Sequence, residues 1–135
     1  MKRNIFRLGL LTAVIIVATS ACGFSFTTAN IAEARMAKDP EGNQPTETFT
    51  PQDTFYVVVD LDNAPEDTVI RSEWTAVDVE GAEPNTSIDS AELTTGSGQL
   101  HFKLENNSPW PPGEYQVELF IDDESRETLD FQVEG

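Results

Sequence analysis

The sequence of 135 residues contains one cysteine, Cys22, and one histidine, His101. A single cysteine excludes a disulfide within the chain, so a folded domain must be stabilised by its core alone. The same two counts exclude a zinc site built from several cysteines and histidines. His101 lies on the polar phase of an alternating segment, which is typical of a solvated surface histidine rather than of a catalytic base.

Basic residues are also scarce, because the chain has 8 Lys and Arg against 24 Asp and Glu, a formal net charge of −16. Three of the basic residues and none of the acidic ones precede Cys22, so the chain from Cys22 onward has a net charge of −19. A field of this sign repels nucleic acid and anionic membrane surfaces, and we expect no nucleic-acid partner. It suits cations, basic partners or a salty medium, although plain solubility or adaptation to high salt explains it more simply.

A long uncharged stretch occurs only near the N-terminus. Basic residues in Met1–Arg7 are followed by an apolar run, Leu8–Ala18, and by the small residues Thr19, Ser20 and Ala21. This order predicts an export signal that forms an apolar helix. An uncleaved membrane anchor is the alternative, since about 20 apolar residues span a bilayer. Both interpretations place the basic residues in the cytosol and the rest of the chain outside.

The residues that end this stretch, Thr19-Ser20-Ala21-Cys22, resemble the lipobox of bacterial lipoproteins. In that family the cysteine thiol takes a diacylglycerol before the signal is removed. The family usually has leucine where this chain has Thr19. The resemblance implies a lipoprotein signal peptide at residues 1–21, and a lipidated Cys22 with its tether at residues 22–30. It also implies attachment to the outer side of the cytoplasmic membrane or to the outer membrane.

The rest of the chain has the period-2 pattern of half-buried strands, separated by turn residues such as Asn-Ala-Pro and Gly-Ser-Gly. The clearest segments are Phe55–Leu61, Ile70–Ala76, Leu100–Leu104, Tyr115–Ile121 and Leu129–Val133, and weaker ones are Ala32–Ala37 and Ser87–Leu93. About seven short strands predict one all-β domain over residues 31–135, an antiparallel β-sandwich.

One segment is more specific for the fold. In Pro109-Trp110-Pro111-Pro112-Gly113-Glu114-Tyr115 the prolines fix φ, the glycine permits a reversal, and a tyrosine opens an alternating strand. It resembles the tyrosine corner of immunoglobulin-like sandwich domains in bacterial surface proteins. The resemblance implies a structural corner of Trp110, Gly113 and Tyr115, with the Tyr115 hydroxyl bonded to upstream backbone, and Trp74 as the buried core tryptophan.

Two groups of residues are candidates for binding. Oxygen-bearing side chains gather around one predicted turn, and calcium prefers such ligands; they are Asp60, Asp62, Asn63, Glu66 and Asp67. Their spacing is not that of an EF-hand, and solvated acidic loops are the alternative. Four apolar side chains take the phase opposite to the predicted core and would form an exposed interaction strip unless loops cover them; they are Tyr56, Val58, Val77 and Phe120.

These features predict an exported, membrane-tethered lipoprotein that acts as a non-catalytic binding or structural module at the cell envelope. Its partners would be the membrane, through the lipid on Cys22, and an unknown protein or surface polymer. A calcium-binding module is the alternative. A carboxylate-based hydrolase is a weaker alternative. Acidic residues are so abundant here that two carboxylates lying close together do not by themselves indicate a catalytic pair. We expect the chain to have no enzymatic activity and to bind no cofactor.

Overall fold

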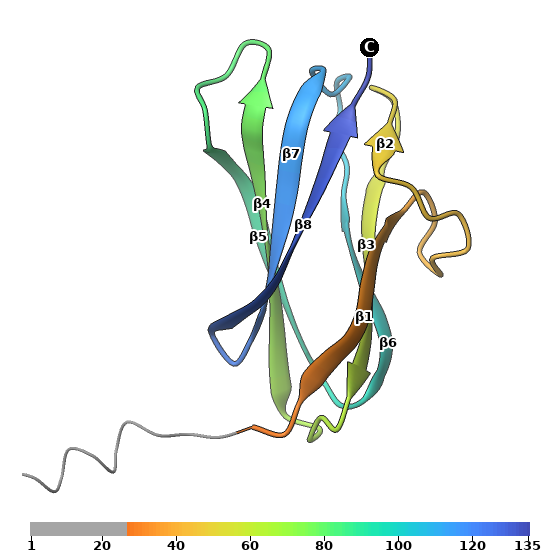
Figure 1. The fold of residues 1–135 in the computed structure, drawn as a ribbon, viewed down its shortest axis with the longest axis vertical. Helices are drawn as coiled ribbons and strands as arrows, with labels where there is room; N and C mark the ends of the chain where they lie inside the picture. The colour runs from red at the N-terminus through yellow and green to blue at the C-terminus, as the bar shows by residue number, and fades with distance from the viewer. Residues whose placement is uncertain (1–26) are drawn as a thin grey trace, which may run out of the picture.

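The computed structural model describes residues 27–135, so the predictions for the signal peptide and for Cys22 lie outside the described residues. The chain forms two facing sheets (Figure 1). One has the order β1-β3-β6 and the other β2-β8-β7-β4-β5. The bounds are β1 Asn30–Ala37, β2 Thr48–Phe49, β3 Phe55–Asp62, β4 Thr68–Val79, β5 Thr86–Thr95, β6 Gly98–Leu104, β7 Gly113–Ile121 and β8 Glu124–Val133.

The prediction of an all-β sandwich is confirmed, with eight strands rather than about seven. The additional strand, β2, has two residues and pairs with β8 in parallel, whereas the other pairs are antiparallel. Within residues 27–135 no helix is long and apolar enough to cross a membrane. Most connections are short, and Asp122 and Asp123 take positive φ in the two-residue turn between β7 and β8.

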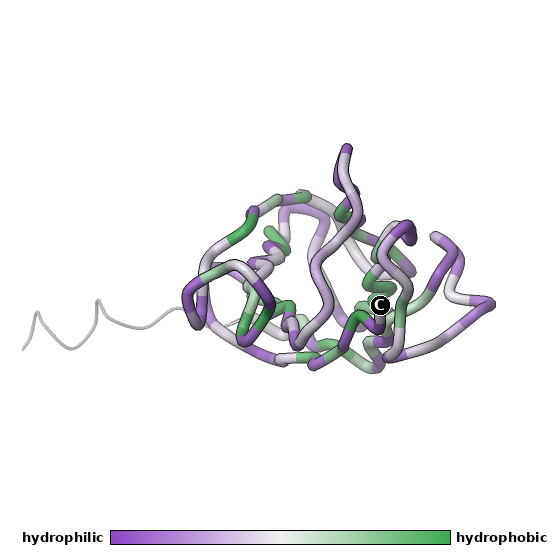
Figure 2. Tube along the Cα trace, turned by 90° about the horizontal axis from the view of Figure 1, so that it is seen from above, coloured by the Kyte–Doolittle hydropathy of each residue, from purple (hydrophilic) through white to green (hydrophobic). Residues whose placement is uncertain are grey.

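The core lies between the sheets, and every second side chain of the central strands is buried there. Figure 2 shows the trace from above, with hydrophobic and hydrophilic segments distinguished by colour. In β3, β4 and β7 the inward side chains are almost fully buried; they include Phe55, Val57, Val59, Leu61, Ile70, Trp74, Val117, Leu119 and Ile121. Ser72 is also buried, and its hydroxyl accepts a hydrogen bond of 3.1 Å from the indole N–H of Trp74. The buried indole is therefore satisfied within its own strand.

Aromatic rings fill the end of the core opposite the start of β1. Phe55 stacks on Trp110 with ring centroids 4.7 Å apart, and Phe131 meets Phe55 at 4.8 Å. The hydroxyl of Tyr115 donates a 2.6 Å hydrogen bond to the carbonyl oxygen of Pro111. Burial raises the pKa of Tyr115 above its ordinary value, so the hydroxyl keeps its proton and remains a donor.

The folded domain begins before the predicted boundary. Ala29 is buried in the core, and the Thr28 hydroxyl donates a 2.6 Å hydrogen bond to the carbonyl oxygen of Asn63. The guanidinium of Arg126 donates to the carbonyl oxygen of Ala29. Residues 27–30 therefore belong to the folded domain, because they pack against loops distant in sequence.

The turn before β3 depends on a charged cap. Asp53 accepts a 2.7 Å hydrogen bond from the backbone N–H of Thr50 and pairs with Lys38 at 3.5 Å. Desolvation by burial is the largest single influence on the pKa of Asp53 and raises it, but these hydrogen bonds and Lys38 together outweigh it and lower the pKa. A carboxyl with a lowered pKa stabilises the fold above its unfolded pKa and loses that effect as the pH falls through the folded value.

We therefore expect Asp53→Asn to lower the free energy of unfolding by about 0.5–1 kcal/mol at pH 7. The difference from the unaltered chain should shrink as the pH falls below about 4, the ordinary pKa of an aspartate. Urea denaturation of both chains at several pH values measures this. A difference that is as large at pH 3 as at pH 7 would contradict the assignment of the effect to the ionised carboxylate.

Candidate functional site

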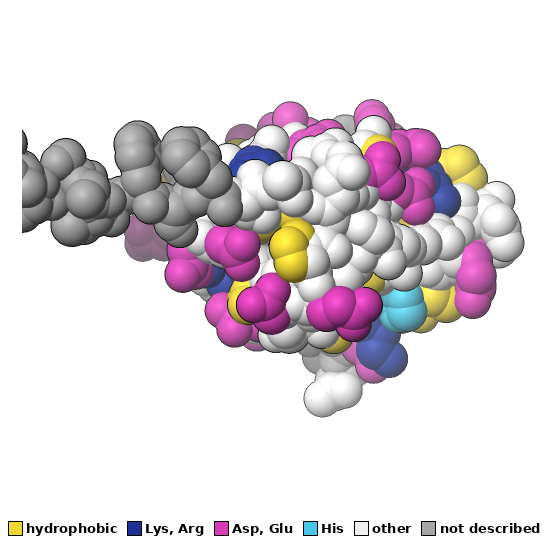
Figure 3. Space-filling view, turned by 90° about the horizontal axis from the view of Figure 1, so that it is seen from below, with side chains coloured by type: hydrophobic (Ala, Val, Ile, Leu, Met, Phe, Trp, Pro, Cys, Tyr) yellow, Lys and Arg dark blue, Asp and Glu magenta, His cyan; other side chains and the backbone are white. Residues whose placement is uncertain are grey.

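Acidic loops occupy the end of the sandwich where β1 begins. The β3–β4 and β7–β8 connections meet there, because Asp122 exchanges hydrogen bonds with the backbone of Val69. Exposed carboxylates on these connections are Asp62, Glu66, Asp67, Asp122 and Asp123. Figure 3 looks onto this end and shows acidic side chains spread across it. We call this region, where β1 begins at Asn30, the Asn30 end.

The predicted calcium ligands are dispersed at the Asn30 end. Asp60 pairs with Arg35 at 3.5 Å on the outer side of β3, and Asn63 donates to the side-chain oxygen of Asn30 at 3.3 Å. Among residues 27–135 no three Asp, Glu, His or Cys side chains gather as a metal site requires. Calcium binding stays a prediction, which thermal unfolding with calcium, with magnesium at equal ionic strength and with a chelator tests.

The predicted apolar strip is wrong as one surface, because its residues lie on two outer faces that point away from each other. Tyr56 and Val58 belong to β3 in the three-stranded sheet, whereas Val77 and Phe120 belong to β4 and β7 in the other. The alternation of residues along each strand predicted which face of its own sheet a side chain occupies. It did not indicate which strands share a sheet.

Val58 is moreover fully buried. Its outer-face neighbour Arg35 donates a 3.2 Å hydrogen bond to the carbonyl oxygen of Gly42, and Gln99 donates to that of Glu41 at 3.1 Å. These bonds hold the connection between β1 and β2, residues 38–47, over the outer face of the three-stranded sheet. The loop therefore removes Val58 from solvent.

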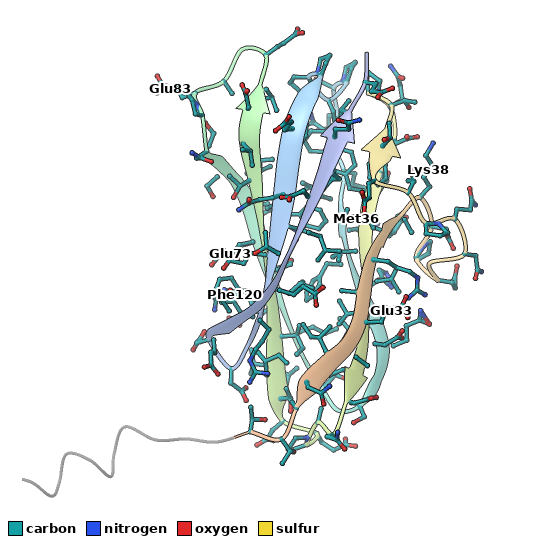
Figure 4. All side chains as sticks on the ribbon, viewed as in Figure 1. Glu33, Met36, Lys38, Glu73, Glu83 and Phe120 are labelled. Carbon is teal, nitrogen blue, oxygen red and sulfur yellow. The ribbon has the colours of Figure 1, made fainter. Side chains whose placement is uncertain are left out.

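Phe120 is half-buried beneath a cation. The guanidinium carbon of Arg71 lies 4.1 Å from the Phe120 ring centroid, and its nitrogens contact Asp123 at 2.5 Å and Glu73 at 3.1 Å. The hydrogen bond that Arg71 donates to Asp123, followed by the one that it donates to Glu73, raises the pKa of Arg71. Figure 4 shows Glu73 and Phe120 projecting from the same side of the sheet. Arg71 thus covers the apolar ring of Phe120 with a guanidinium group that two carboxylates hold in place.

The upper part of the outer face of the five-stranded sheet has an open hollow of about 430 Å³. Its walls come from β2, β4, β7 and β8 and the residue before β2; they are Glu47, Thr48, Val77, Glu114, Tyr115, Asp130, Phe131 and Gln132. Three of these side chains are carboxylates and none is basic. The hollow has an acidic rim and a floor formed by the strands, with no reactive nucleophile–base pair on its lining.

The fifth strand of this sheet, β5, is exposed along almost its whole length. Eight of its ten residues are exposed, and only Ile88 and Thr95 are half-buried. Leu93 is 40% exposed, the largest exposure of a big apolar side chain among the described residues. The sequence predicted a weak strand at Ser87–Leu93 but no role for it. The signal in the sequence is that polar residues occupy both faces of this strand. Such a pattern indicates an edge strand that the facing sheet does not cover.

The groups considered for catalysis are spread over the surface. His101 is exposed on β6, and its ring lies 5.8 Å from that of Tyr56. The carboxyl groups with shifted pKa values, Asp39 and Asp53, both have lowered values, the opposite of a general acid held protonated at neutral pH. For Asp39 the largest influence, desolvation, raises the pKa, but backbone hydrogen bonds from Asn43 and Gln44 outweigh it.

No protein-family model and no curated protein sequence matches the chain. Solved structures do match it in fold. An immunoglobulin-like protein from Pseudomonas aeruginosa is 16% identical with a TM-score of 0.55, and the match covers 82% of this chain and 100% of that one. The fold is immunoglobulin-like.

Two enzymes contain a similar region. An alkylpurine DNA glycosylase from Pseudomonas fluorescens, bound to DNA with an abasic site analogue, is 12% identical with a TM-score of 0.54. A β-glucosidase from Listeria innocua is 15% identical with a TM-score of 0.50. The matches cover 31% and 17% of these two chains. At such identities the likeness concerns the fold alone, and this fold serves many functions.

Proposed function

We propose that this chain is an exported lipoprotein whose immunoglobulin-like domain is a non-catalytic binding module, held at the cell envelope by a lipid on Cys22. The observation that carries the proposal is the position of Cys22 directly after a basic, apolar and small-residue segment, five positions before the first described residue of a compact domain. A neutral thiol next to a signal has no packing role, whereas a lipidated one anchors the domain.

The distances fit a short tether. Five extended residues reach at most about 17 Å, so the domain would stand close to the membrane. Thr27, Thr28 and Ala29 join the fold at the Asn30 end, so this end would face the lipid. Carboxylates at this end repel anionic headgroups, so the domain would stand on its tether rather than lie on the surface. The opposite end and the sides of the sandwich are then free for a partner.

The binding role is tested by capture from envelope membranes after brief chemical cross-linking. The lipidated protein is compared with a form in which residues 1–22 are replaced by a secretory signal without cysteine. We expect defined envelope proteins that are enriched several-fold with the tethered form, because the tether raises the local concentration of the domain. Recovery of the same background proteins with both forms would contradict a binding role.

A further inference from the structure

The free edge of β5 is the feature that carries an inference. β5 pairs with β4 on one side only and ends the order of the five-stranded sheet. Alternate backbone N–H and C=O groups of such a strand point away from its neighbour and are open to another strand. With ten residues, β5 offers an edge of about 33 Å.

Both faces of β5 are also uncovered, because the facing sheet has three strands and ends at β6. Leu93 and Ala91 pair in register with the inward residues Ile70 and Ser72, so they lie on the inner face of the sheet. Both are nevertheless exposed, since no strand lies opposite them. A strand added beside β5 would place its own inward side chains next to Leu93 and Ala91.

The other edges are protected in ways that β5 is not. β2 has two residues, β1 is broken by a bulge between Ile31 and Glu33, and β6 carries Lys103 and is tied to Glu41 through Gln99. Short length, bulges and lysine are the usual devices that prevent pairing at a sheet edge. β5 contains neither proline nor lysine, and its register irregularity lies near one end, opposite Trp74 and Thr75.

The charge of β5 selects the kind of strand that fits. Its two charged residues, Asp89 and Glu92, form no ion pair with any described residue. The five basic residues within 27–135 already contact other carboxylates; they are Arg35, Lys38, Arg71, Lys103 and Arg126. A second copy of this acidic chain would be repelled, whereas a basic segment would be attracted.

We propose that an extended polypeptide segment that alternates lysine or arginine with apolar residues adds to β5 as a sixth strand of this sheet. Main-chain hydrogen bonds along β5 supply the affinity, the apolar side chains cover Leu93 and Ala91, and the basic side chains meet Glu92 on the outer face. The inference deepens the proposed function, on which it rests, by naming the surface and the chemistry of the partner.

The test uses the full-length protein in detergent micelles and a nine-residue peptide in which lysine alternates with valine. Amide hydrogen exchange is measured with and without the peptide at physiological ionic strength, where exposed charges farther apart than about 8 Å are screened. We expect slower exchange confined to residues 86–95. A peptide that alternates lysine with proline has the same charge but cannot form a strand, and it should bind at least about tenfold more weakly.

Two double variants separate local from general electrostatics. Asp89→Lys with Glu92→Lys should weaken binding of the lysine–valine peptide by about tenfold, a change of about 1.4 kcal/mol in binding free energy. The control, Glu127→Lys with Asp130→Lys, changes the net charge equally on β8, which β7 and β4 separate from β5, and should alter binding by less than about twofold. The proline peptide, tested on the unaltered protein, keeps the test decisive even if a β5 variant unfolds.

Three results would overturn the inference. The first is equal binding of the lysine–proline peptide, which shows attraction without strand addition. The second is protection that appears only outside residues 86–95. The third is a β5 already protected in the free protein, by a second copy or by residues 1–26. None of these results bears on the lipid at Cys22, which is measured separately by mass, so a failure here is distinguishable from a failure of the proposed function.

Discussion

Replacing Phe55 by alanine is expected to lower the free energy of unfolding by about 3–5 kcal/mol. Phe55 is fully buried, and its ring lies within 6 Å of the rings of Phe49, Trp110, Tyr115 and Phe131. Removing it opens a cavity where both sheets and the 109–112 segment meet. A domain of this size is stable by only about 5–15 kcal/mol, so the variant should be close to unfolding at 37 °C.

Urea denaturation of the full chain, followed by tryptophan fluorescence, measures this loss, and Phe120→Ala is the matched control. The same atoms are removed there, but Phe120 is half-exposed beneath Arg71. The control should cost about 1 kcal/mol, mainly the lost cation–π contact. Equal losses in the two variants would show that the aromatic cluster is not the centre of the core.

Replacing Gly113 by alanine is expected to be nearly as damaging. Gly113 has φ of +147°, and an added Cβ would overlap the carbonyl oxygen of Asp78 and lie 2.6 Å from the Cα of Val79. The variant must therefore separate β7 from β4 at the point where β7 begins and β4 ends. Tyr115, two residues later, would shift away from the carbonyl oxygen of Pro111 with which it bonds.

Gly98→Ala is the control that separates backbone strain from overlap. Gly98 has φ of +132°, but an added Cβ would meet no atom within 4 Å. Strain alone costs about 1–3 kcal/mol, and the overlap at Gly113 should add about 1–3 kcal/mol more. Thermal unfolding of both variants measures the difference. A Gly113→Ala chain as stable as Gly98→Ala would contradict the close approach of β4 and β7.

The sequence predicted the parts of the fold that depend on short-range patterns. Alternation in Phe55–Leu61 and Tyr115–Ile121 reflects strands at the centre of each sheet, where one face is always buried. The proline–glycine corner was recognisable because its residues have few other conformations. These signals are local, and the strands they describe lie where tertiary contacts reinforce them.

The candidate surfaces were harder to predict because they depend on which strands share a sheet. The alternation in β3 places Val58 on the outer face and predicts that it is exposed. It is nevertheless buried, because a loop held by Arg35 covers it. Asp60 has the chemistry of a calcium ligand, yet Arg35, 25 positions earlier, pairs with it. β5 became recognisable as an open edge only when the facing sheet proved to have three strands. No spacing in the sequence carries this information.

In the proposed function, the negative charge of the surface acts both on the approach to the membrane and on the choice of partner. Each basic residue within 27–135 already contacts a carboxylate, so the remaining negative charge is open to the surroundings. Under that proposal it would keep the domain off an anionic membrane at the Asn30 end, and along β5 it would favour a basic partner over a second copy.

The central claim is that Cys22 is the lipidated first residue of the exported protein, and intact-mass measurement of the protein extracted from membranes tests it most directly. The account predicts a chain that begins at Cys22 and carries the added mass of a diacylglyceryl group, while Cys22→Ala keeps residues 1–21 and gains no lipid. An unmodified chain that begins at Met1 in the unaltered protein, or a lipid-free chain cut elsewhere, would contradict it.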